Sequence, residues 1–503
     1  MVKVKSSRLR FGTDGWRAII DDEFTLSNVE RVASAIGRYV LRAAAGKAPR
    51  GKPAGGLPGA RPERPRVLVG YDTRRLSRES ADAAAGILAD LGIDVYLSTG
   101  FAPTPALATC VVKLELDGAL IVTASHNPPS YNGIKFKPPY GGSATAEITA
   151  AIEEELDRAD GNGKEEASER QAAAGLGSVF DFDPASVYLP HLRELVDFEV
   201  IRSRAPRVAV DVLCGAGQGY FNRLSEELGG RFWEFHSEID PLFCGLSPEP
   251  IPANLAPLQD HISKHPVDLA LALDGDGDRV GALDPEGNFL SSHHIFSLIL
   301  RYLAGARGER GRVIKTVSTT RMIDLLAGRY DLPLTVTPVG FKHIALYLLE
   351  GGVLMAGEES GGLWIRGHIP DRDGILIGLL LVELLCREGP IREQLESLFS
   401  EVGPHYYERI DLEIRAEDHP GILRRLGGHR PERIAGRPVA WTDRMDGYKY
   451  TSADGSWLMI RPSGTEAVVR VYAEAGTPDQ VQDLLQAGRA LIEDGSEKQK
   501  GKE

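Results

Sequence analysis

This 503-residue chain has few cysteines, no excess of basic residues and no long apolar run. The 4 cysteines are scattered without a CxxC pair, so the sequence suggests neither a disulfide framework nor a zinc site and favours a reducing cytoplasm. The formal net charge of -13 argues against a nucleic-acid partner, because proteins that bind nucleic acid are usually basic. These shortages leave an ordinary globular protein, with 42% hydrophobic and 26% charged residues.

The chain also gives little sign of a membrane partner. Its most apolar run, residues 375–386, is short and contains Glu383, which is typical of a core helix rather than of a membrane span. The first residues, MVKVK, lack the apolar core of a signal peptide. We therefore expect a cytoplasmic protein with neither a membrane nor a nucleic-acid partner.

The length predicts several domains, because 503 residues are too many for one hydrophobic core. Strands alternate with amphipathic helices in three successive regions, the first helix beginning at a capping box of Ser27 and Glu30. The last part reads as antiparallel strands followed by a helix. We therefore predict an α/β protein of three α/β domains with mixed sheets and a C-terminal α+β domain. The predicted boundaries are 1–185, 186–289, 290–403 and 404–503. Exposed loops are expected at 43–65 and 159–177.

The most informative run is TASHNPP at 123–129, which follows the apolar strand 118–122. Two prolines end this strand, because proline can neither continue a ladder nor enter a helix interior. The run predicts that Ser125 is presented on a rigid turn rather than buried, with His126 beside it as a possible proton carrier. An ordinary polar turn is the alternative.

A second run, DGDGDR at 274–279, follows another apolar strand. Alternate carboxylates separated by glycines let the backbone curl so that three hard oxygen ligands converge on one cation. An EF-hand does not fit, because its sixth position should be glycine and is Arg279, and its twelfth should be Glu and is Pro285. A solvated acidic turn is the alternative, although carboxylates this close repel one another.

Two further loops carry groups suited to phosphate. The run RPSGTE at 461–466 lies between two predicted strands and offers an arginine fork, two hydroxyls and an open glycine backbone. Such a set forms a concave anion cradle, with a hairpin turn as the alternative. The run FGTDGWR at 11–17 adds Arg17 on a glycine-bent loop.

Three more glycine-containing runs differ in what they indicate. In GEESGG at 357–362, Glu358 and Ser360 are placed to address the hydroxyls of a polyol, although the run reads equally well as a turn. The run TPVGFK places Lys342 at a helix start. The run GAGQGY does not fit the GxGxxG of dinucleotide binders, because Tyr220 stands where the third glycine belongs. We read it as a tight strand-to-helix turn.

In this order the motifs resemble those of the α-D-phosphohexomutase superfamily, which includes phosphoglucomutase, phosphomannomutase and phosphoglucosamine mutase. The resemblance runs from about residue 10 to residue 471. It implies four domains around a central cleft, with one loop from each. It also implies an intramolecular phosphotransferase that interconverts hexose 1-phosphate and hexose 6-phosphate. The implied route uses an enzyme phosphoserine and a hexose 1,6-bisphosphate, which also acts as activator.

The resemblance implies a role for each motif. Ser125 resembles the phosphoserine, whose phosphate completes the shell of a Mg²⁺ ion held by carboxylates. These carboxylates are Asp274, Asp276 and Asp278. The groups around the reacting phosphate are Arg17, His126, Lys135 and Arg279. The groups that bind the substrate are Lys342, Glu358, Ser360, Arg461, Ser463, Gly464 and Thr465. Glu358 and Ser360 are implied to hold the sugar hydroxyls, and the Arg461 loop to clamp the phosphate that is not reacting.

The form of two motifs favours glucose as the sugar. GEES and the lysine of TPVGFK are closest to glucomutases, and mannose or glucosamine stay as alternatives. A metal-dependent phosphatase or serine hydrolase is a reading from another class, disfavoured because the sequence has no GxSxG elbow. A non-catalytic sugar-phosphate sensor on the same fold is a third. The expected partner is a phosphosugar, and the chain is expected to be a monomer or a homodimer.

Overall fold

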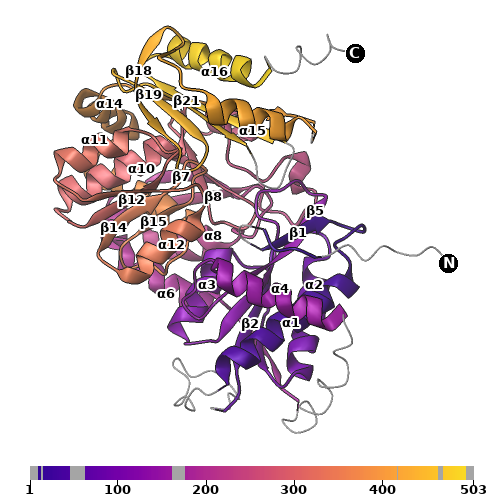
Figure 1. The fold of residues 1–503 in the computed structure, drawn as a ribbon. Helices are drawn as coiled ribbons and strands as arrows, with labels where there is room; N and C mark the ends of the chain where they lie inside the picture. The colour runs from indigo at the N-terminus through magenta and orange to yellow at the C-terminus, as the bar shows by residue number, and fades with distance from the viewer. Residues whose placement is uncertain are drawn as a thin grey trace. The chain divides into compact units, whose positions relative to one another are not determined.

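The computed structural model describes residues 9–12, 15–45, 63–160, 176–415, 417–462 and 468–493. The chain forms two compact units. The first consists of 1–295, 345–351 and 360–391, and the second of 296–344, 352–359 and 392–503. Figure 1 shows the helices and strands coloured in chain order. Most of the two predicted loops, 43–65 and 159–177, lies outside the described residues.

A six-stranded mixed sheet begins the first unit, in the order β1-β5-β4-β2-β3-β6. Its strands are β1 (Trp16–Ile19), β2 (Arg66–Tyr71), β3 (Asp94–Ser98), β4 (Gly118–Val122), β5 (Tyr131–Lys137) and β6 (Val179–Phe182). Strand β4 is parallel to β2 and antiparallel to β5. The pairing of β5 with β4 places Lys135 opposite Ile121, and the antiparallel pairing of β5 with β1 places Arg17 opposite Gly133.

Helices cover both faces of this sheet. They are α1 (Leu26–Ala44), α2 (Ser77–Asp90), α3 (Thr104–Lys113) and α4 (Ala146–Asp160). Helices α1, α2 and α4 share a core with Val67 and Leu120, whereas α3 shares another with Leu68 and Ile121. Adjacent strand residues point to opposite faces, so these two cores lie on the two sides of the sheet.

A second mixed sheet of five strands, in the order β11-β10-β9-β7-β8, also belongs to the first unit. Its strands are β7 (Arg207–Asp211), β8 (Arg231–Phe235), β9 (Leu269–Leu273), β10 (Val280–Leu283) and β11 (Phe289–Leu290). The accompanying helices are α6 (Ala185–Leu195), α7 (Phe198–Arg204), α8 (Tyr220–Leu228), η2 (Phe243–Gly245), η3 (Pro252–Asn254), α9 (Ala256–Lys264) and α13 (Gly374–Glu388). Strand β15 (Leu363–Ile365) also belongs to the first unit but not to this sheet. Helix α8 follows the GAGQGY run, as predicted.

Helix α13 is the core helix that the apolar run predicted. Nearly all of its residues are buried, and the carboxylate of Glu383 accepts a hydrogen bond from the Asp197 N–H at 2.9 Å. Within the part of the chain that the structure describes, no helix is long and apolar enough to cross a membrane.

The second unit contains a parallel set of strands and an antiparallel sheet. In the first set, β12 (Arg312–Thr316) pairs with β13 (Leu334–Thr337) and β14 (Val353–Gly357). The helical elements near it in the chain are α10 (Ser292–Arg301), η4 (Tyr302–Ala306), α11 (Met322–Arg329), α12 (Phe341–Glu350) and α14 (Ile391–Val402). The antiparallel sheet has six strands in the order β16-β21-β20-β19-β18-β17.

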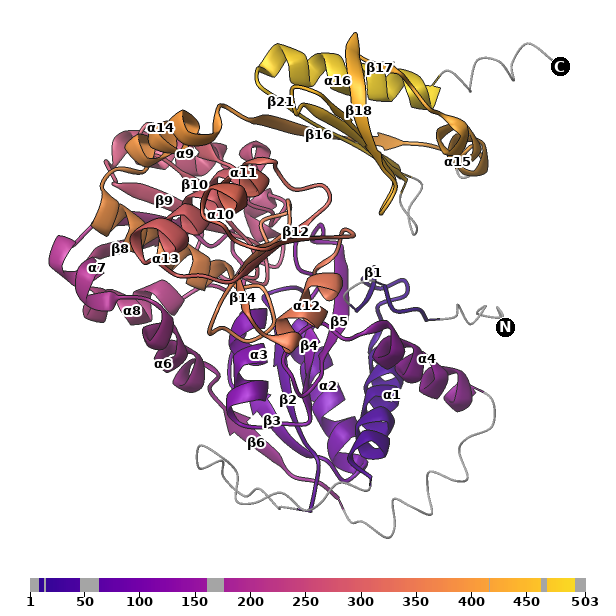
Figure 2. The same cartoon turned by 60° about the vertical axis from the view of Figure 1, so that its left-hand side comes forward.

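Helix α16 (Pro478–Glu493) lies along one face of the antiparallel sheet (Figure 2). The strands are β16 (Tyr406–Glu413), β17 (Arg433–Ile434), β18 (Arg437–Asp443), β19 (Tyr448–Ser452), β20 (Trp457–Pro462) and β21 (Val468–Ala475), and α15 (His419–Gly428) accompanies them. The α/β sheets and this C-terminal α+β part confirm the predicted fold class.

Two local expectations were wrong. Helix α1 begins at Leu26, and its cap is Thr25, whose hydroxyl accepts from the Asn28 N–H. Ser27 therefore lies inside the first turn rather than at a capping box. Cys214 and Cys244 form a disulfide although 30 positions separate them. The fold brings the β7–α8 turn and η2 together, which cysteine spacing alone does not show.

Candidate active site

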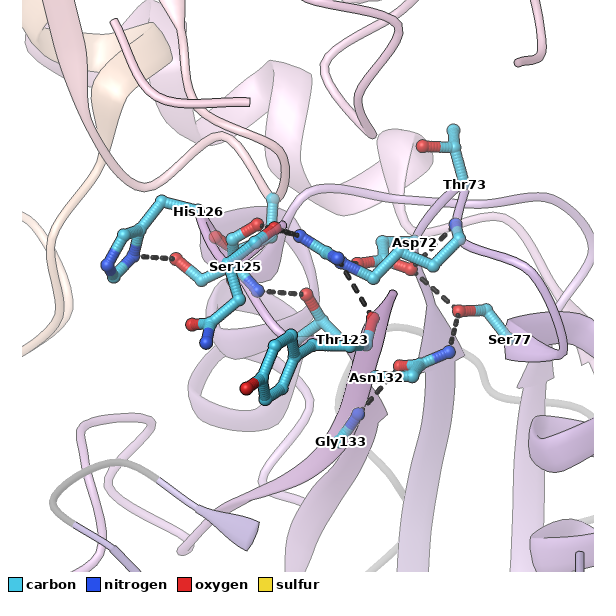
Figure 3. Close-up of polar contacts among 12 residues, drawn as sticks. Asp72, Thr73, Ser77, Thr123, Ser125, His126, Asn132 and Gly133 are labelled. Carbon is cyan, nitrogen blue, oxygen red and sulfur yellow. Dashed lines mark hydrogen bonds and ion pairs between the residues drawn. The ribbon is translucent and has the colours of Figure 1, made fainter. Parts of the chain in front are cut away.

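Ser125 lies on the turn that follows β4, and its backbone is strained. Its φ is 52°, in the left-handed region that non-glycine residues rarely adopt and that costs about 1–3 kcal/mol. The Ser125 N–H donates to Thr123 Oγ1 at 2.9 Å, and His126 Nδ1 lies 3.5 Å from Ser125 Oγ (Figure 3). The sequence predicted an exposed Ser125, and this prediction was wrong, because the residue is only 1% exposed. It is buried because a second loop packs against its turn.

That second loop joins β9 to β10 and carries the three aspartates. It is closed by the Arg279 N–H, which donates to Asp274 Oδ1 at 3.0 Å. Gly277 has a φ of 71°, and a Cβ at this position would lie 2.9 Å from Pro103 Cβ. Only glycine fits there without a shift, so the alternation of carboxylates and glycines does allow the predicted curl.

The two loops meet at a hydrogen bond. Ser125 Oγ donates to Asp274 Oδ2 at 3.0 Å. The contact is close along the backbone too, because a Cβ on Gly275 would lie 2.5 Å from the Ser125 carbonyl oxygen. The structure thus brings the predicted nucleophile against the predicted metal loop.

The three carboxylates form a site that suits a hard cation. One oxygen from each of Asp274, Asp276 and Asp278 lies within 4.8 Å of the others, and all three residues are buried. Among the described residues, neither Asp276 Oδ1 nor Asp278 Oδ1 has a hydrogen-bond partner. Burial and the charges of Asp278 and Asp276 raise the pKa of Asp274 well above its ordinary value. Buried carboxylate oxygens that lack a hydrogen bond and repel one another fit a divalent cation such as Mg²⁺.

Buried cations flank the same carboxylates. Lys135 Nζ lies 2.8 Å from Asp276 Oδ2 and 3.3 Å from Asp278 Oδ2, and Lys135 is 2% exposed. Burial by itself raises the pKa of Asp276, but the Lys135 charge and hydrogen bond bring it below its ordinary value. Arg372 Nη2 donates to Asp278 Oδ2 at 2.7 Å, and Thr104 Oγ1 donates to Asp276 Oδ2 at 2.6 Å.

Arg279, His126 and Arg17 lie around the same loops. Arg279 Nε is 3.8 Å from Asp278 Oδ1 and 4.0 Å from Asp274 Oδ2, so the guanidinium lies beside the acidic cluster. Arg17 Nη1 donates to Asn127 Oδ1 at 2.6 Å, on the Ser125 turn. Burial and the positive charges of Arg279 and Arg17 lower the pKa of His126 well below its ordinary value. The His126 ring is therefore neutral at pH 7.

The predicted substrate residues divide between the two units. Ser360 belongs to the first, and Lys342, Glu358 and Arg461 belong to the second. Glu358 follows β14 and is 5% exposed. The remaining three predicted residues lie outside the described residues; they are Ser463, Gly464 and Thr465.

Arg461, on β20, has a charged partner. Its Nε lies 2.9 Å from Asp446 Oδ2, and the same oxygen accepts a hydrogen bond from the Val339 N–H at 2.9 Å. Asp446 therefore ties the arginine of the RPSGTE run to the TPVGFK run within the second unit. The sequence analysis did not single out Asp446, because nothing nearby in the sequence marks it.

Two buried arginines of the first unit were also missed: Arg372, which contacts the metal loop, and Arg74, which contacts the Ser125 turn. Arg74 Nη2 donates to the Ser125 carbonyl oxygen at 2.6 Å. Arg74 stands in the run GYDTRR directly after β2, and Arg372 in the run PDRDG before α13. A charged residue next to the end of a buried strand or the start of a buried helix was the available signal in both cases.

Comparisons with known proteins identify this arrangement. Family models of phosphoglucomutase/phosphomannomutase match domain I at residues 54–162, domain II at 186–287, domain III at 291–402 and the C-terminal domain at 425–490. The chain therefore belongs to the phosphoglucomutase/phosphomannomutase family, within the α-D-phosphohexomutase superfamily. It is an enzyme of the phosphotransferase type that defines this family.

Individual relatives cover nearly the whole chain. A phosphoglucomutase/phosphomannomutase of Thermococcus kodakarensis is 30% identical over 96% of this chain and 98% of its own length. A phosphoglucosamine/phosphogalactosamine mutase of Sulfurisphaera tokodaii is 27% identical over 96% of this chain and 99% of its own. A solved Thermus thermophilus structure, assigned as a phosphomannomutase, superposes with a TM-score of 0.81 at 33% identity, covering 97% of this chain and 99% of that one.

A more distant structure shares the fold alone. It is an N-acetylphosphoglucosamine mutase of Aspergillus fumigatus in complex with GlcNAc-6P and magnesium, with a TM-score of 0.56 and 16% identity. It covers 97% of this chain and 96% of its own. Relatives with different sugars in their names therefore share this architecture, and the family does not by itself select the sugar.

Proposed function

We propose that this protein interconverts glucose 1-phosphate and glucose 6-phosphate through a phosphoserine at Ser125 and a glucose 1,6-bisphosphate intermediate. The observation that carries the proposal is the 3.0 Å hydrogen bond from the Ser125 hydroxyl to Asp274, inside a buried cluster of three aspartates. Phosphoryl transfer needs a positioned oxygen and dense positive charge more than covalent help from the protein. The site supplies both.

Mg²⁺ is the proposed cofactor. Asp274, Asp276 and Asp278 would hold it, and it would supply charge neutralisation for the phosphoryl group carried by Ser125. The support is the pair of buried carboxylate oxygens without hydrogen-bond partners, together with the magnesium complex of the Aspergillus fumigatus relative.

The chain's own residues carry the transfer. A sugar hydroxyl oxygen forms a new bond to phosphorus while the bond from Ser125 Oγ to phosphorus breaks, and the proton of that hydroxyl passes to Ser125 Oγ. Neutral His126, whose Nδ1 lies 3.5 Å from Ser125 Oγ, would accept this proton as the new bond forms and donate it to the departing Ser125 oxygen, and the reverse step runs the same transfers backwards. Arg279, Arg17 and Lys135 offset the negative charge that passes between the two oxygens.

The substrate itself is proposed to be held by groups from two loops and a cradle. A sugar bisphosphate carries roughly four negative charges, two on each phosphate, so it needs a cationic partner at each end. Ser125 with its cations is proposed to bind one phosphate. Arg461, with Ser463, Gly464 and Thr465 in the same run, is proposed to bind the other phosphate, and Lys342, Glu358 and Ser360 are proposed to bind the sugar hydroxyls.

The domain boundaries 1–185, 186–289, 290–403 and 404–503 stay a proposal, supported by the ranges of the four family matches.

A cytoplasmic location is proposed as well, because a sugar phosphate carries charges that do not cross a lipid bilayer unaided. We also propose that the enzyme works as a monomer or a homodimer.

Turnover measurements test the function and the sugar together. Glucose, mannose and glucosamine 1-phosphates are each supplied with Mg²⁺ and the matching 1,6-bisphosphate as primer. We expect the 6-phosphate in each active reaction, with the highest kcat/KM for glucose. A higher kcat/KM for mannose or glucosamine would correct the sugar. Net release of inorganic phosphate without isomerisation would instead favour a phosphatase.

A further inference from the structure

Ser125 keeps its left-handed backbone because both of its backbone polar groups have partners. Its N–H donates to Thr123 Oγ1 at 2.9 Å, and its carbonyl oxygen accepts from Arg74 Nη2 at 2.6 Å. Relaxation of φ to negative values would turn both groups away from these partners and would move Oγ away from Asp274. Arg74 thus opposes the relaxation of the residue that carries the reacting oxygen.

The same guanidinium contacts the whole turn. Its Nη2 also donates to the Asn127 carbonyl oxygen at 2.6 Å, and its Nη1 donates to the carbonyl oxygens of Pro128 and Tyr131, both at 2.9 Å. With Ser125, four carbonyls of one turn converge on a single planar fork. Because the fork is rigid, it fixes the positions of these carbonyls relative to one another.

Arg74 is itself anchored from behind. Its side chain is completely buried, and its Nε lies 3.2 Å from Asp72 Oδ2. Asp72 Oδ1 accepts from the Arg74 N–H at 3.0 Å and from Ser77 Oγ at 2.7 Å (Figure 3). The Asp72 N–H donates to the carbonyl oxygen of Val122, at the end of the strand that leads to the turn. The Phe243 ring lies over the guanidinium, 4.7 Å from its Cζ.

We propose that Arg74 is a positioning residue that holds Ser125 in its left-handed conformation, with Oγ directed at the aspartate cluster. The inference rests on the proposed function of Ser125. All the hydrogen bonds given above for the Arg74 side chain go to the main chain of the turn, so its effect on the reaction passes through Ser125. A displacement of about 1 Å at the reacting atom can cost about 100-fold in rate. The loss should therefore appear in kcat and not in KM.

The test compares Arg74→Lys with Arg66→Lys in the full-length protein. Lysine keeps the positive charge but cannot present a planar fork to four carbonyls. Arg66 is a matched control, because it is also buried, at 3% exposure, and donates to a single carbonyl, that of Glu115, at 3.2 Å. Circular dichroism first shows at which temperature both variants are folded.

Two readouts separate positioning from folding: kcat against KM, and the rate at which glucose 1,6-bisphosphate phosphorylates Ser125. For Arg74→Lys we expect both rates to fall about 100-fold, with KM within about threefold of wild type. Arg66→Lys should keep both rates within about threefold. Equal rates in the two variants would overturn the positioning role. A wild-type protein that neither turns over nor accepts phosphate would overturn the proposed function, and the inference with it.

If Arg74→Lys does not fold, a second variant tests the positioning role of Arg74. Asp72→Asn keeps an oxygen for Ser77 and for the Arg74 N–H, and replaces the charged oxygen that faces the guanidinium by a neutral amide NH2. We expect kcat to fall about tenfold with KM unchanged, because one charge-assisted contact to the arginine is lost. A kcat within twofold of wild type, in a folded Asp72→Asn protein, would overturn the inference.

Discussion

The hydroxyl oxygen of Ser125 lies 3.0 Å from Asp274 Oδ2, although 149 positions separate the two residues in the chain. Ser125 follows a strand of one sheet and Asp274 follows a strand of the next, and both sheets belong to the first unit. The turn and the metal loop therefore meet through packing inside one folded unit.

Metal binding should stabilise the protein through the aspartate cluster. Asp276→Asn removes one anionic ligand, so we expect Mg²⁺ to raise the Tm of wild type by several degrees and that of the variant by much less. Asp260→Asn is the control, because Asp260 is exposed and pairs with Lys264 at 2.7 Å. A chelator should abolish turnover, and Mg²⁺ should restore it. Equal Tm shifts in wild type and Asp276→Asn would show that the cluster is structural.

The proposed sugar contact can be separated from the phosphoryl chemistry. Glu358→Gln should lower kcat/KM for glucose 1-phosphate and mannose 1-phosphate by about 10- to 100-fold, because a hydrogen bond to a charged acceptor becomes one to a neutral amide. Phosphorylation of Ser125 by the bisphosphate should still occur. Glu350→Gln, at an exposed position of α12, serves as the control. Unchanged kcat/KM in Glu358→Gln would remove Glu358 from the substrate site.

Stability should depend on pH through Asp373, which caps α13. Its carboxylate accepts from the Leu376 N–H at 2.9 Å and from the Tyr188 hydroxyl at 2.8 Å, and burial raises its pKa to about 7. The unfolded chain loses this proton near pH 3.9, and the folded chain keeps it until about pH 7. Between these values the unfolded state binds fewer protons, so the contribution of Asp373 to the unfolding free energy falls as pH rises, by up to ~4 kcal/mol.

Asp373→Asn removes that titration and keeps an oxygen for the helix cap. The unfolding free energy of the variant minus that of wild type should therefore increase from pH 4 to pH 7 and stay level above. Urea unfolding at several pH values measures the difference. A difference that does not change with pH would contradict the raised pKa of Asp373.

The sequence predicted those parts of the site that lie in continuous runs after strands. TASHNPP and DGDGDR are such runs, and the strands before them, β4 and β9, form as expected. Their residue types indicate their chemistry locally, since clustered carboxylates and a serine shortly before two prolines need no distant partner to be recognised. The family follows from the same runs, because their order along the chain is distinctive.

What the sequence did not predict depends on contacts between distant segments. Arg74 acts on carbonyl oxygens, which every residue has, so its partners leave no trace in side-chain patterns. The burial of Ser125 depends on a loop from another sheet, and the disulfide joins Cys214 to a turn 30 positions away. Strand β5, which carries Lys135, was not predicted because the polar residues in YNGIKFK interrupt the apolar run. Its lysines are buried beside carboxylates.

Intact-mass spectrometry of the protein after incubation with glucose 1,6-bisphosphate and Mg²⁺ tests the central claim most directly. Wild type should gain the mass of one phosphoryl group, and peptide mapping should place it on Ser125. Ser125→Ala should gain none and should lose turnover by a factor of about 1,000 or more, because the phosphoryl acceptor is gone. A wild-type protein that interconverts sugar phosphates while Ser125 stays unmodified under every priming condition would contradict the account.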